Sequence, residues 1–379
     1  MQKSILPIML VAGMFATIAS VQAHPDREKE SDDGLSIAVY GDSPYGLSNA
    51  DTAQFNATPA FIQTINDDSD VQLVLNVGVI HSGKQFCSDQ YDMSIYNLWA
   101  AFKSPLVYTP GDNEWADCHK SKEGGLNPLD RLAQIRSIFF PTPGHTIAVD
   151  KPVLSQKLNY DPKFPSDSDY VENVMWEQSK IVFVTLNLPG GSNNDEDNWL
   201  GLARTQAQTD EILKRSSAAK RWLDKAFVLA NQGHARAVVI QIQADMWDLD
   251  GTVPAALHID NYRQFIDSIA LNATLFRKPV LLLNGDSHGF RSDNPLVKGA
   301  PCVTEAGAGV VACSDDAYDT QANGYNVKNF HRLAVHGSVA PMEWLKLEVK
   351  PGDSDGRARA NSFGPFSWKR TITSLPLQP

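Results

Sequence analysis

Side chains that could bind a metal or transfer a proton follow five apolar runs of the chain, at the point where each run ends. The run 280–284 is typical of a buried strand and leads directly into Asp286 and His288. Four other runs end in polar residues of the same kinds: Asp42, His81, Asp112, Asn113, Glu114, His119, Gln243 and Asp245. Ligands in open α/β sheets bind at the carboxyl ends of strands, so we expect these side chains to meet at one rim. Oxygen and nitrogen ligands of this mix suit divalent cations such as manganese, iron or zinc, which polarise a phosphoryl oxygen and acidify a bound water.

Helix-like segments lie between the apolar runs that position these residues. Strands followed by loops are expected at 35–46, 71–84, 105–119, 180–195, 236–248 and 279–290. Helices are expected at 58–68, 91–104, 127–140, 203–232 and 261–276. The alternation predicts an α/β fold, while 331–337 and 343–349 have the pattern of antiparallel strands. Residues 141–178 are rich in Pro and Asp, and we interpret them as a loop-rich insertion over the site.

The N-terminus has the pattern of a secretory signal peptide, with a positive start, an apolar stretch at 5–19 and a small-residue cleavage site at 21–23. We therefore expect a signal peptide at 1–23, a polar leader at 24–34, a single domain at 35–350 and a C-terminal tail at 351–379. No later stretch approaches the roughly 20 apolar residues of a membrane helix. The protein is predicted to be secreted, or periplasmic in a bacterium.

Composition argues against one class of partner. The chain has 379 residues and a formal net charge of −11, and no run of Lys or Arg interrupts the acidic sequence. Nucleic-acid binding through a basic face is therefore not expected. A hydrophobic content of 42% is enough for a large core.

The four cysteines are disulfide candidates in an exported protein. Three pairings are possible, and we favour Cys87 with Cys118 and Cys302 with Cys313 because each is local. Metal binding is the alternative, but no pair has the C-x-x-C spacing of a zinc knuckle.

The order of the strand-end motifs resembles the calcineurin-like metallophosphoesterase superfamily. The chain offers "GDSP" (41–44), "GVIH" (78–81), "GDNE" (111–114), "IQAD" (242–245) and "GDSH" (285–288). The superfamily has D-x-H, G-D-x-x, G-N-H-D/E, a lone H and G-H-x-H in this order. The longer strings "GDSPYG", "HSGKQFCSD", "YTPGDNEWADCH" and "NGDSHGF" are similar to those of a group of exported bacterial members.

The resemblance implies a mixed β-sandwich flanked by helices, in four layers, and a metal site that hydrolyses a phosphoester with a metal-bound hydroxide. It implies metal ligands at Asp42, His81, Asp112, Gln243, Asp286 and His288, and catalytic roles for Asn113 and His119. One or two divalent ions (Mn, Fe or Zn) and a small phosphoester substrate would be its cofactor and partner.

Two departures weaken the expected site. Pro44 stands where the first motif has a ligand His, and Val79 stands where the second has an Asp that bridges two metals. A valine side chain has no lone pair to offer a cation. His81, two residues further on, is a candidate substitute for that ligand.

Three other interpretations remain open. "VYGDS" (39–43) resembles the first block of serine esterases that begin with Gly-Asp-Ser, with Ser43 as nucleophile, although Asp286 and His288 are not spaced as its last block requires. "DLDGT" (248–252) resembles the nucleophile motif of haloacid-dehalogenase phosphatases, but no apolar strand runs straight into it. The third interpretation is a catalytically degenerate binding protein on the same fold.

Overall fold

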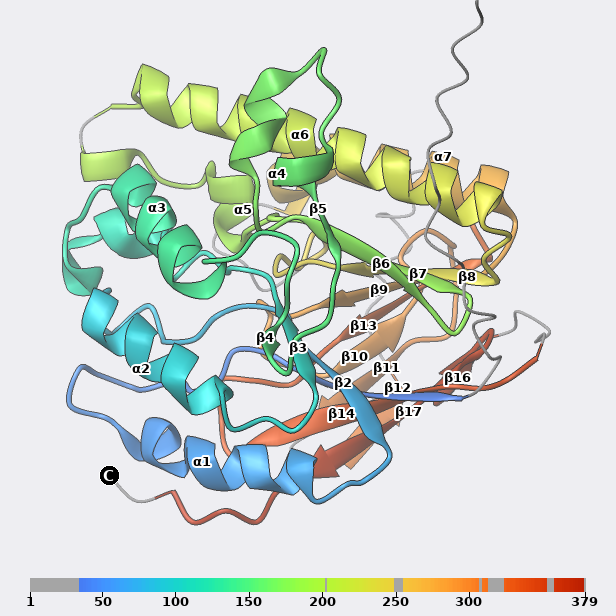
Figure 1. The fold of residues 1–379 in the computed structure, drawn as a ribbon, viewed down its shortest axis with the longest axis horizontal. Coiled ribbons are helices and arrows are strands. Elements are labelled where there is room, and N and C mark those ends of the chain that lie inside the picture. Colours follow the sequence, from blue (N-terminus) through green and yellow to red (C-terminus); the bar gives the residue numbers. More distant parts are fainter. Residues whose placement is uncertain are drawn as a thin grey trace, which may run out of the picture. The chain divides into compact units, whose positions relative to one another are not determined.

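The computed structural model describes residues 34–201, 203–248, 255–306, 309–312, 324–352 and 358–377, all within one compact unit that begins at Asp32. The predicted signal peptide (1–23) and nearly all of the leader (24–34) lie outside the described residues. Two mixed β-sheets, with helices on their outer faces, make up this unit (Figure 1). Among the described helices, none is both long enough and apolar enough to cross a membrane.

The first sheet has the order β15-β16-β17-β14-β1-β2-β3-β4. Its central strands β1 (Leu35–Tyr40), β2 (Val71–Asn76) and β3 (Pro105–Tyr108) are parallel. The antiparallel strands of this sheet are β4 (Ile147–Ala148), β14 (Glu343–Val349), β15 (Ala358–Arg359), β16 (Ser362–Phe363) and β17 (Phe366–Ile372).

The expected C-terminal tail at 351–379 requires correction. Strand β17 pairs with β14 along its whole length, from Glu343–Ile372 to Val349–Phe366. Phe363, Phe366 and Trp368 are buried in the core, so the described part of this segment belongs to the sandwich. The alternation of Phe366 and Trp368 with polar residues in "FSWKRTI" is the strand signal that the sequence analysis missed.

The second sheet has the order β12-β11-β10-β13-β9-β8-β7-β6-β5. Its parallel strands are β7 (Ile181–Thr185), β8 (Ala237–Gln241), β9 (Val280–Asn284) and β13 (Phe330–Ala334). Its antiparallel strands are β5 (Leu154–Ser155), β6 (Val174–Gln178), β10 (Arg291–Asp293), β11 (Val303–Ala306) and β12 (Gly309–Ala312). The expected antiparallel character holds for β14, whereas β13 is parallel to β9 and antiparallel to β10.

The buried apolar clusters show that the fold has four layers of helices and sheets. Apolar side chains from both sheets form one shared cluster, which includes Ile37, Leu73, Phe183 and Leu281. The outer face of the first sheet packs with helices α1 (Ala53–Asn66), α2 (Asp89–Trp99) and α3 (Pro128–Phe139). The outer face of the second packs with α6 (Gln206–Gln232) and α7 (Ala255–Phe276). The predicted four-layer α/β sandwich is confirmed.

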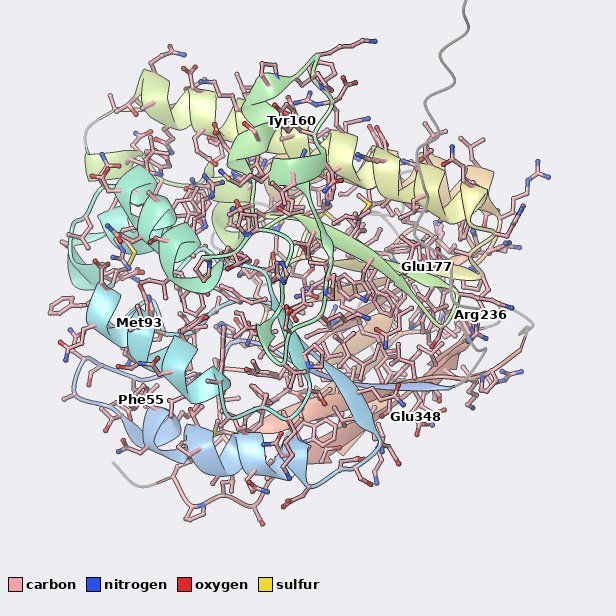
Figure 2. The ribbon with its side chains drawn as sticks, viewed as in Figure 1. Phe55, Met93, Tyr160, Glu177, Arg236 and Glu348 are labelled. Atoms are coloured by element: carbon pink, nitrogen blue, oxygen red, sulfur yellow. A yellow bond between two sulfur atoms is a disulfide. The ribbon has the colours of Figure 1, made fainter. Side chains whose placement is uncertain are left out.

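The insertion at 141–178 does not have the expected position over the strand-end residues. It contains β4, β5, β6, a short helix α4 (Gln156–Asn159) and the turn Pro165–Asp169. It contacts α6 instead, where Arg221 pairs with Asp167 and Gln156 donates to the Ala218 carbonyl. Tyr160 marks this outer edge in Figure 2. Arg236 and Glu348 mark the end of the sandwich where the parallel strands begin, opposite their carboxyl ends.

One predicted disulfide is confirmed. Cys87 and Cys118 are bonded, and Cys118 follows the "GDNE" motif by four residues. Cys302 is also disulfide-bonded, but the predicted partner, Cys313, lies outside the described residues. The oxidised pair fits an oxidising compartment.

Candidate metal centre

The loops after the parallel strands hold their polar residues in a conformation that L-residues seldom adopt. Backbone φ is positive at Asp42 (47°), Val79 (58°), Asp286 (75°) and His288 (63°). Such residues cost free energy, most of all when they are β-branched, and they cluster at functional sites. These backbone conformations therefore lower the stability of the fold and set the directions of the side chains.

Asp42, Asp286 and His288 meet although up to 246 residues separate them in sequence. The backbone N–H of Asp286 donates to Oδ2 of Asp42 over 3.2 Å. The other oxygen of Asp42, Oδ1, is buried without a hydrogen-bond partner and lies 3.8 Å from Nε2 of His288. A carboxylate oxygen and a ring nitrogen at this separation can share a cation that lies about 2.0–2.2 Å from each.

Asp112 lies on the other side of Asp286, and Gln243 joins the two carboxylates. Nε2 of Gln243 is 3.2 Å from Oδ1 of Asp112 and 3.1 Å from Oδ1 of Asp286. Its Oε1 accepts from the backbone N–H of Gly190, which fixes the orientation of the amide. Gln243 therefore presents N–H groups to the carboxylates. It is not the metal ligand that we expected but a bridge that holds the two ligands.

Asp42 and Asp112 are buried and Asp286 is half-buried beside them, and this crowding shifts the pKa of each carboxyl group. Burial, followed by the charge of Asp112, raises the pKa of Asp42 well above its usual range. Burial raises the pKa of Asp112 to about 7, and burial with Asp112 raises that of Asp286. Burial lowers the pKa of His288 to about 4, so its ring is neutral at pH 7 and Nε2 can offer a lone pair. Carboxylates crowded together in this way are a setting that a bound cation stabilises.

His81 and His119 are not part of this cluster. Nδ1 of His81 faces the Ser82 carbonyl at 3.2 Å, and its ring packs edge-on against Tyr91 of α2. Nδ1 of His119 faces the Ala116 carbonyl at 2.8 Å. His119 lines an open cavity of ≈ 880 Å³ together with Lys120, Lys122, Glu196 and Asp197. Nε2 of His81 is buried without a hydrogen-bond partner, so the role of His81 as a substitute ligand stays a prediction.

Asn113 lies at the edge of the cluster. Its backbone N–H donates to Oδ1 of Asp112 over 2.9 Å, and its side-chain amide donates to the His81 carbonyl over 3.0 Å. Glu114, next along the chain, turns inward and accepts from the Tyr108 hydroxyl and the Ile80 N–H.

A left-handed turn, which sequence reasoning missed, covers the cluster. Gly191, Ser192, Asn193 and Asn194 all have φ between 54° and 63° within the short element α5 (Gly190–Asn194). Gly190 precedes them, and a Cβ there would lie 2.5 Å from both Oδ2 of Asp112 and Oδ1 of Asp286. The signal in the sequence was "PGGSNND", because Gly and Asn tolerate left-handed backbone best.

Two helices clamp this turn. Arg215 of α6 is fully buried and donates to Oδ1 of Asn193 over 2.7 Å and to its carbonyl over 3.1 Å. From α7, the Tyr262 hydroxyl accepts from the Asn193 N–H and donates to the Pro189 carbonyl. Without these partners a run of left-handed L-residues would cost about 1–2 kcal/mol per residue.

A second group of possible ligands lies nearby but is already satisfied. Glu305, His336 and Glu343 are the only described His, Cys, Asp or Glu side chains with three ligand atoms within 4.8 Å of one another. Arg370 pairs with both glutamates, and Nδ1 of His336 donates to Glu305. Nε2 of His336 faces two backbone carbonyls, so both ring nitrogens carry protons and none can bind a metal. The same 4.8 Å criterion is not met by any three ligand atoms from Asp42, Asp112, Asp286 and His288.

The geometry around Ser43 does not support the interpretation of the protein as a serine esterase. The Ser43 hydroxyl is buried and donates to Oε1 of Gln54 over 3.4 Å. A nucleophilic serine needs a neighbouring base, and Gln54 is not one. Of the "DLDGT" motif, residues 249–252 lie outside the described residues.

Comparisons with known proteins give little further information. No family model matches the chain, and no curated protein matches it. Among solved structures, it is similar to the purple acid phosphatase PPD1 from yellow lupin (Lupinus luteus) seeds, with 10% identity and a TM-score of 0.39. The match covers 84% of this chain and 50% of that one, so this chain spans about half the length of that protein. A likeness of this size carries no argument, and the proposals below rest on the site.

Proposed function

We propose that this protein is a metal-dependent phosphoester hydrolase of the metallophosphoesterase kind, impaired at its second cation site. The observation that carries the proposal is the partnerless Oδ1 of Asp42, buried 3.8 Å from the neutral ring of His288 and near the buried carboxylate of Asp112 and the half-buried carboxylate of Asp286. Burying charges in this way is stable when they hold a cation.

The donor set fits one cation better than two. Asp42 and His288 would hold it, with the carboxylates of Asp112 and Asp286 close by, and Mn, Fe or Zn suits this mixture of oxygen and nitrogen. When bound, such an ion polarises a phosphoryl oxygen and supplies an acidified water. Val79 and Pro44 offer no ligand atom where a second ion would need one, and His81 is turned toward α2.

The other residues would position the ligands and the substrate. Gln243 keeps Asp112 and Asp286 at a fixed separation, and Gly190 leaves them space. Asn113 lies where it can contact a phosphoester bound at Asp112. His119, which lines the open cavity with Lys120 and Lys122, would exchange a proton with a leaving group that reaches this cavity.

The substrate would be a small phosphoester, reached in the periplasm or outside the cell. The apolar N-terminal stretch and the Cys87–Cys118 bond support export. The acidic net charge of −11 gives no basic face for nucleic acid.

Metal content and hydrolysis test the proposal together. The native protein, loaded with Mn²⁺ and dialysed, should hold close to one ion by elemental analysis and should hydrolyse phosphomonoesters or phosphodiesters slowly. Asp42→Asn should lower Mn²⁺ affinity at least tenfold, whereas the control Asp68→Asn, which changes a carboxylate paired with Lys346 outside the site, should leave it unchanged. A protein that holds one ion but hydrolyses nothing is the degenerate binding protein, and one that holds no ion overturns the proposal.

A further inference from the structure

Tyr45, which sequence reasoning did not single out, lies where the strand-end loops meet. It belongs to the loop after β1, three residues beyond Asp42. Its backbone N–H donates to Oε1 of Gln54 over 3.0 Å, and Nε2 of Gln54 donates to the Ser338 carbonyl over 2.9 Å. Gln54 thus holds the backbone of Tyr45 and links it to the Ser338 carbonyl, while the side chain of Tyr45 remains partly exposed.

The ring of Tyr45 contacts the expected metal ligand His288. The two ring centroids are 5.1 Å apart, with an interplanar angle of 68°. This edge-to-face contact restricts the imidazole whose Nε2 faces Asp42. One side of Tyr45 is therefore a wall of the candidate metal centre.

The hydroxyl of Tyr45 reaches the loops after β2 and β3. It interacts with the side chain of Asn113 and the backbone of Gly83. Asn113 and Gly83 act as donors toward the oxygen, which leaves the hydroxyl proton for another acceptor. An ordinary tyrosine hydroxyl is protonated at neutral pH, so the group is a hydrogen-bond donor.

A phosphoryl group bound at this site needs hydrogen-bond donors, and the nearby Lys120 is already paired with two carboxylates. Lys120 acts on Asp112 through its charge, but its amine is paired with Asp117 at 2.7 Å and Asp197 at 3.2 Å. The first amide hydrogen of Asn113 goes to the His81 carbonyl. Tyr45 is half-buried, and its hydroxyl interacts with Asn113, whose backbone N–H donates to Asp112.

We propose that Tyr45 is a substrate-binding residue whose hydroxyl donates to a non-bridging oxygen of a phosphoryl group held beside Asp42 and Asp112. The proposal rests on the proposed function and adds the group that recognises the anion. A hydrogen bond to a charged oxygen is stronger than one between neutral groups, so its loss should be measurable.

The test is a titration of inorganic phosphate into the Mn²⁺-loaded protein by calorimetry, with Mn²⁺ content measured on the same samples. Tyr45→Phe keeps the ring against His288 and removes only the hydroxyl. It should weaken phosphate binding about tenfold, equal to about 1.4 kcal/mol, and leave Mn²⁺ affinity within twofold. The control Tyr160→Phe, in the insertion (Figure 2), should change neither. In hydrolysis, Tyr45→Phe should raise KM more than it lowers kcat.

Each other result decides against the proposal. Equal phosphate affinity in Tyr45→Phe and the native protein would overturn the role of Tyr45 and leave the metal centre standing. So would a native protein that holds Mn²⁺ but binds no phosphate. Loss of Mn²⁺ from Tyr45→Phe would show that the residue acts on the cation rather than on the anion. A native protein that takes up no Mn²⁺ overturns the metal centre and this role together.

Discussion

Gly190 has no space for a side chain, because a Cβ on it would lie 2.5 Å from the Oδ2 atom of Asp112. The same Cβ would lie 2.5 Å from Oδ1 of Asp286, so the absent side chain leaves the space in which two carboxylates from different strands come together. The glycine is required for this close approach and not for its own backbone conformation, since its neighbour Gly191 supplies the first positive φ, 54°.

Gly190→Ala should therefore damage the metal centre. The added methyl must push Asp112 and Asp286 apart or lift the left-handed turn, and we expect Mn²⁺ affinity to fall at least tenfold. The matched control is Gly289→Ala, next to His288, where the nearest atom to a new Cβ is 3.7 Å away. Equal Mn²⁺ affinity for the two variants, measured by calorimetry, would show that the carboxylates do not act together.

Val79→Asp should create the missing second site. Val79 has a φ of 58°, which strains a β-branched residue and suits Asp or Asn. The carboxylate would offset the repulsion between two cations. We expect a second bound Mn²⁺ and hydrolysis raised at least tenfold, about 1.4 kcal/mol of transition-state stabilisation.

Val79→Asn is the control for that change, because it relieves the same strain without adding charge. Because Val79 is buried, the new amide should not raise thermal stability, and the variant should gain no second ion. If Val79→Asp gains neither metal nor activity, Pro44 becomes the residue that limits the site. If the native protein already holds two ions, our interpretation of Val79 is wrong.

Stability without metal should fall as pH rises. The pKa of Asp112 is raised from 3.8 to about 7 and that of Glu114 from 4.5 to about 8, in both cases chiefly by burial. Between the unfolded and folded pKa values the folded state holds more protons, so the free energy of unfolding decreases with pH. The slope is at most about 1.4 kcal/mol per pH unit for each group.

Urea unfolding at pH 5 and pH 8 in a chelator measures this slope. Asp112→Asn should flatten it, since the amide does not titrate. Saturating Mn²⁺ should oppose it, because the cation binds the ionised carboxylates. A metal-free protein that is more stable at pH 8 than at pH 5 would contradict the proposed burial of these acids.

The Cys87–Cys118 bond should stabilise both the fold and the motif loops. It closes a loop of 31 residues, worth roughly 3–4 kcal/mol in the chain-entropy model. Both sulfur atoms lie close to the Asn113 carbonyl, at 3.3 Å and 3.4 Å. A Cys87→Ala, Cys118→Ala double variant should unfold at lower urea and bind Mn²⁺ more weakly, and unchanged Mn²⁺ affinity would confine the bond to a structural role.

The strands and their polar ends could be predicted because each is local. The run Val280–Asn284 and the residues Asp286 and His288 that follow it were read from adjacent positions. Which atoms point inward could not be read in this way. Gln243 faces the carboxylates with nitrogen because the Gly190 N–H, 53 residues away, takes its oxygen. His81 turns to α2 because Tyr91 packs there. Such orientations depend on partners that only the folded chain brings together.

The clamped turn at 190–195 also sets an order of assembly. Its partners Arg215 and Tyr262 are 22 and 69 residues further along the chain from Asn193. Left-handed L-residues do not persist alone, so this segment can take its shape only after α6 and α7 have docked on the sheet. The strands that carry Asp112 and Asp286 can pair earlier, which leaves their carboxylates open to water and ions until the turn arrives. We therefore expect the centre to be complete only when these two helices are in place.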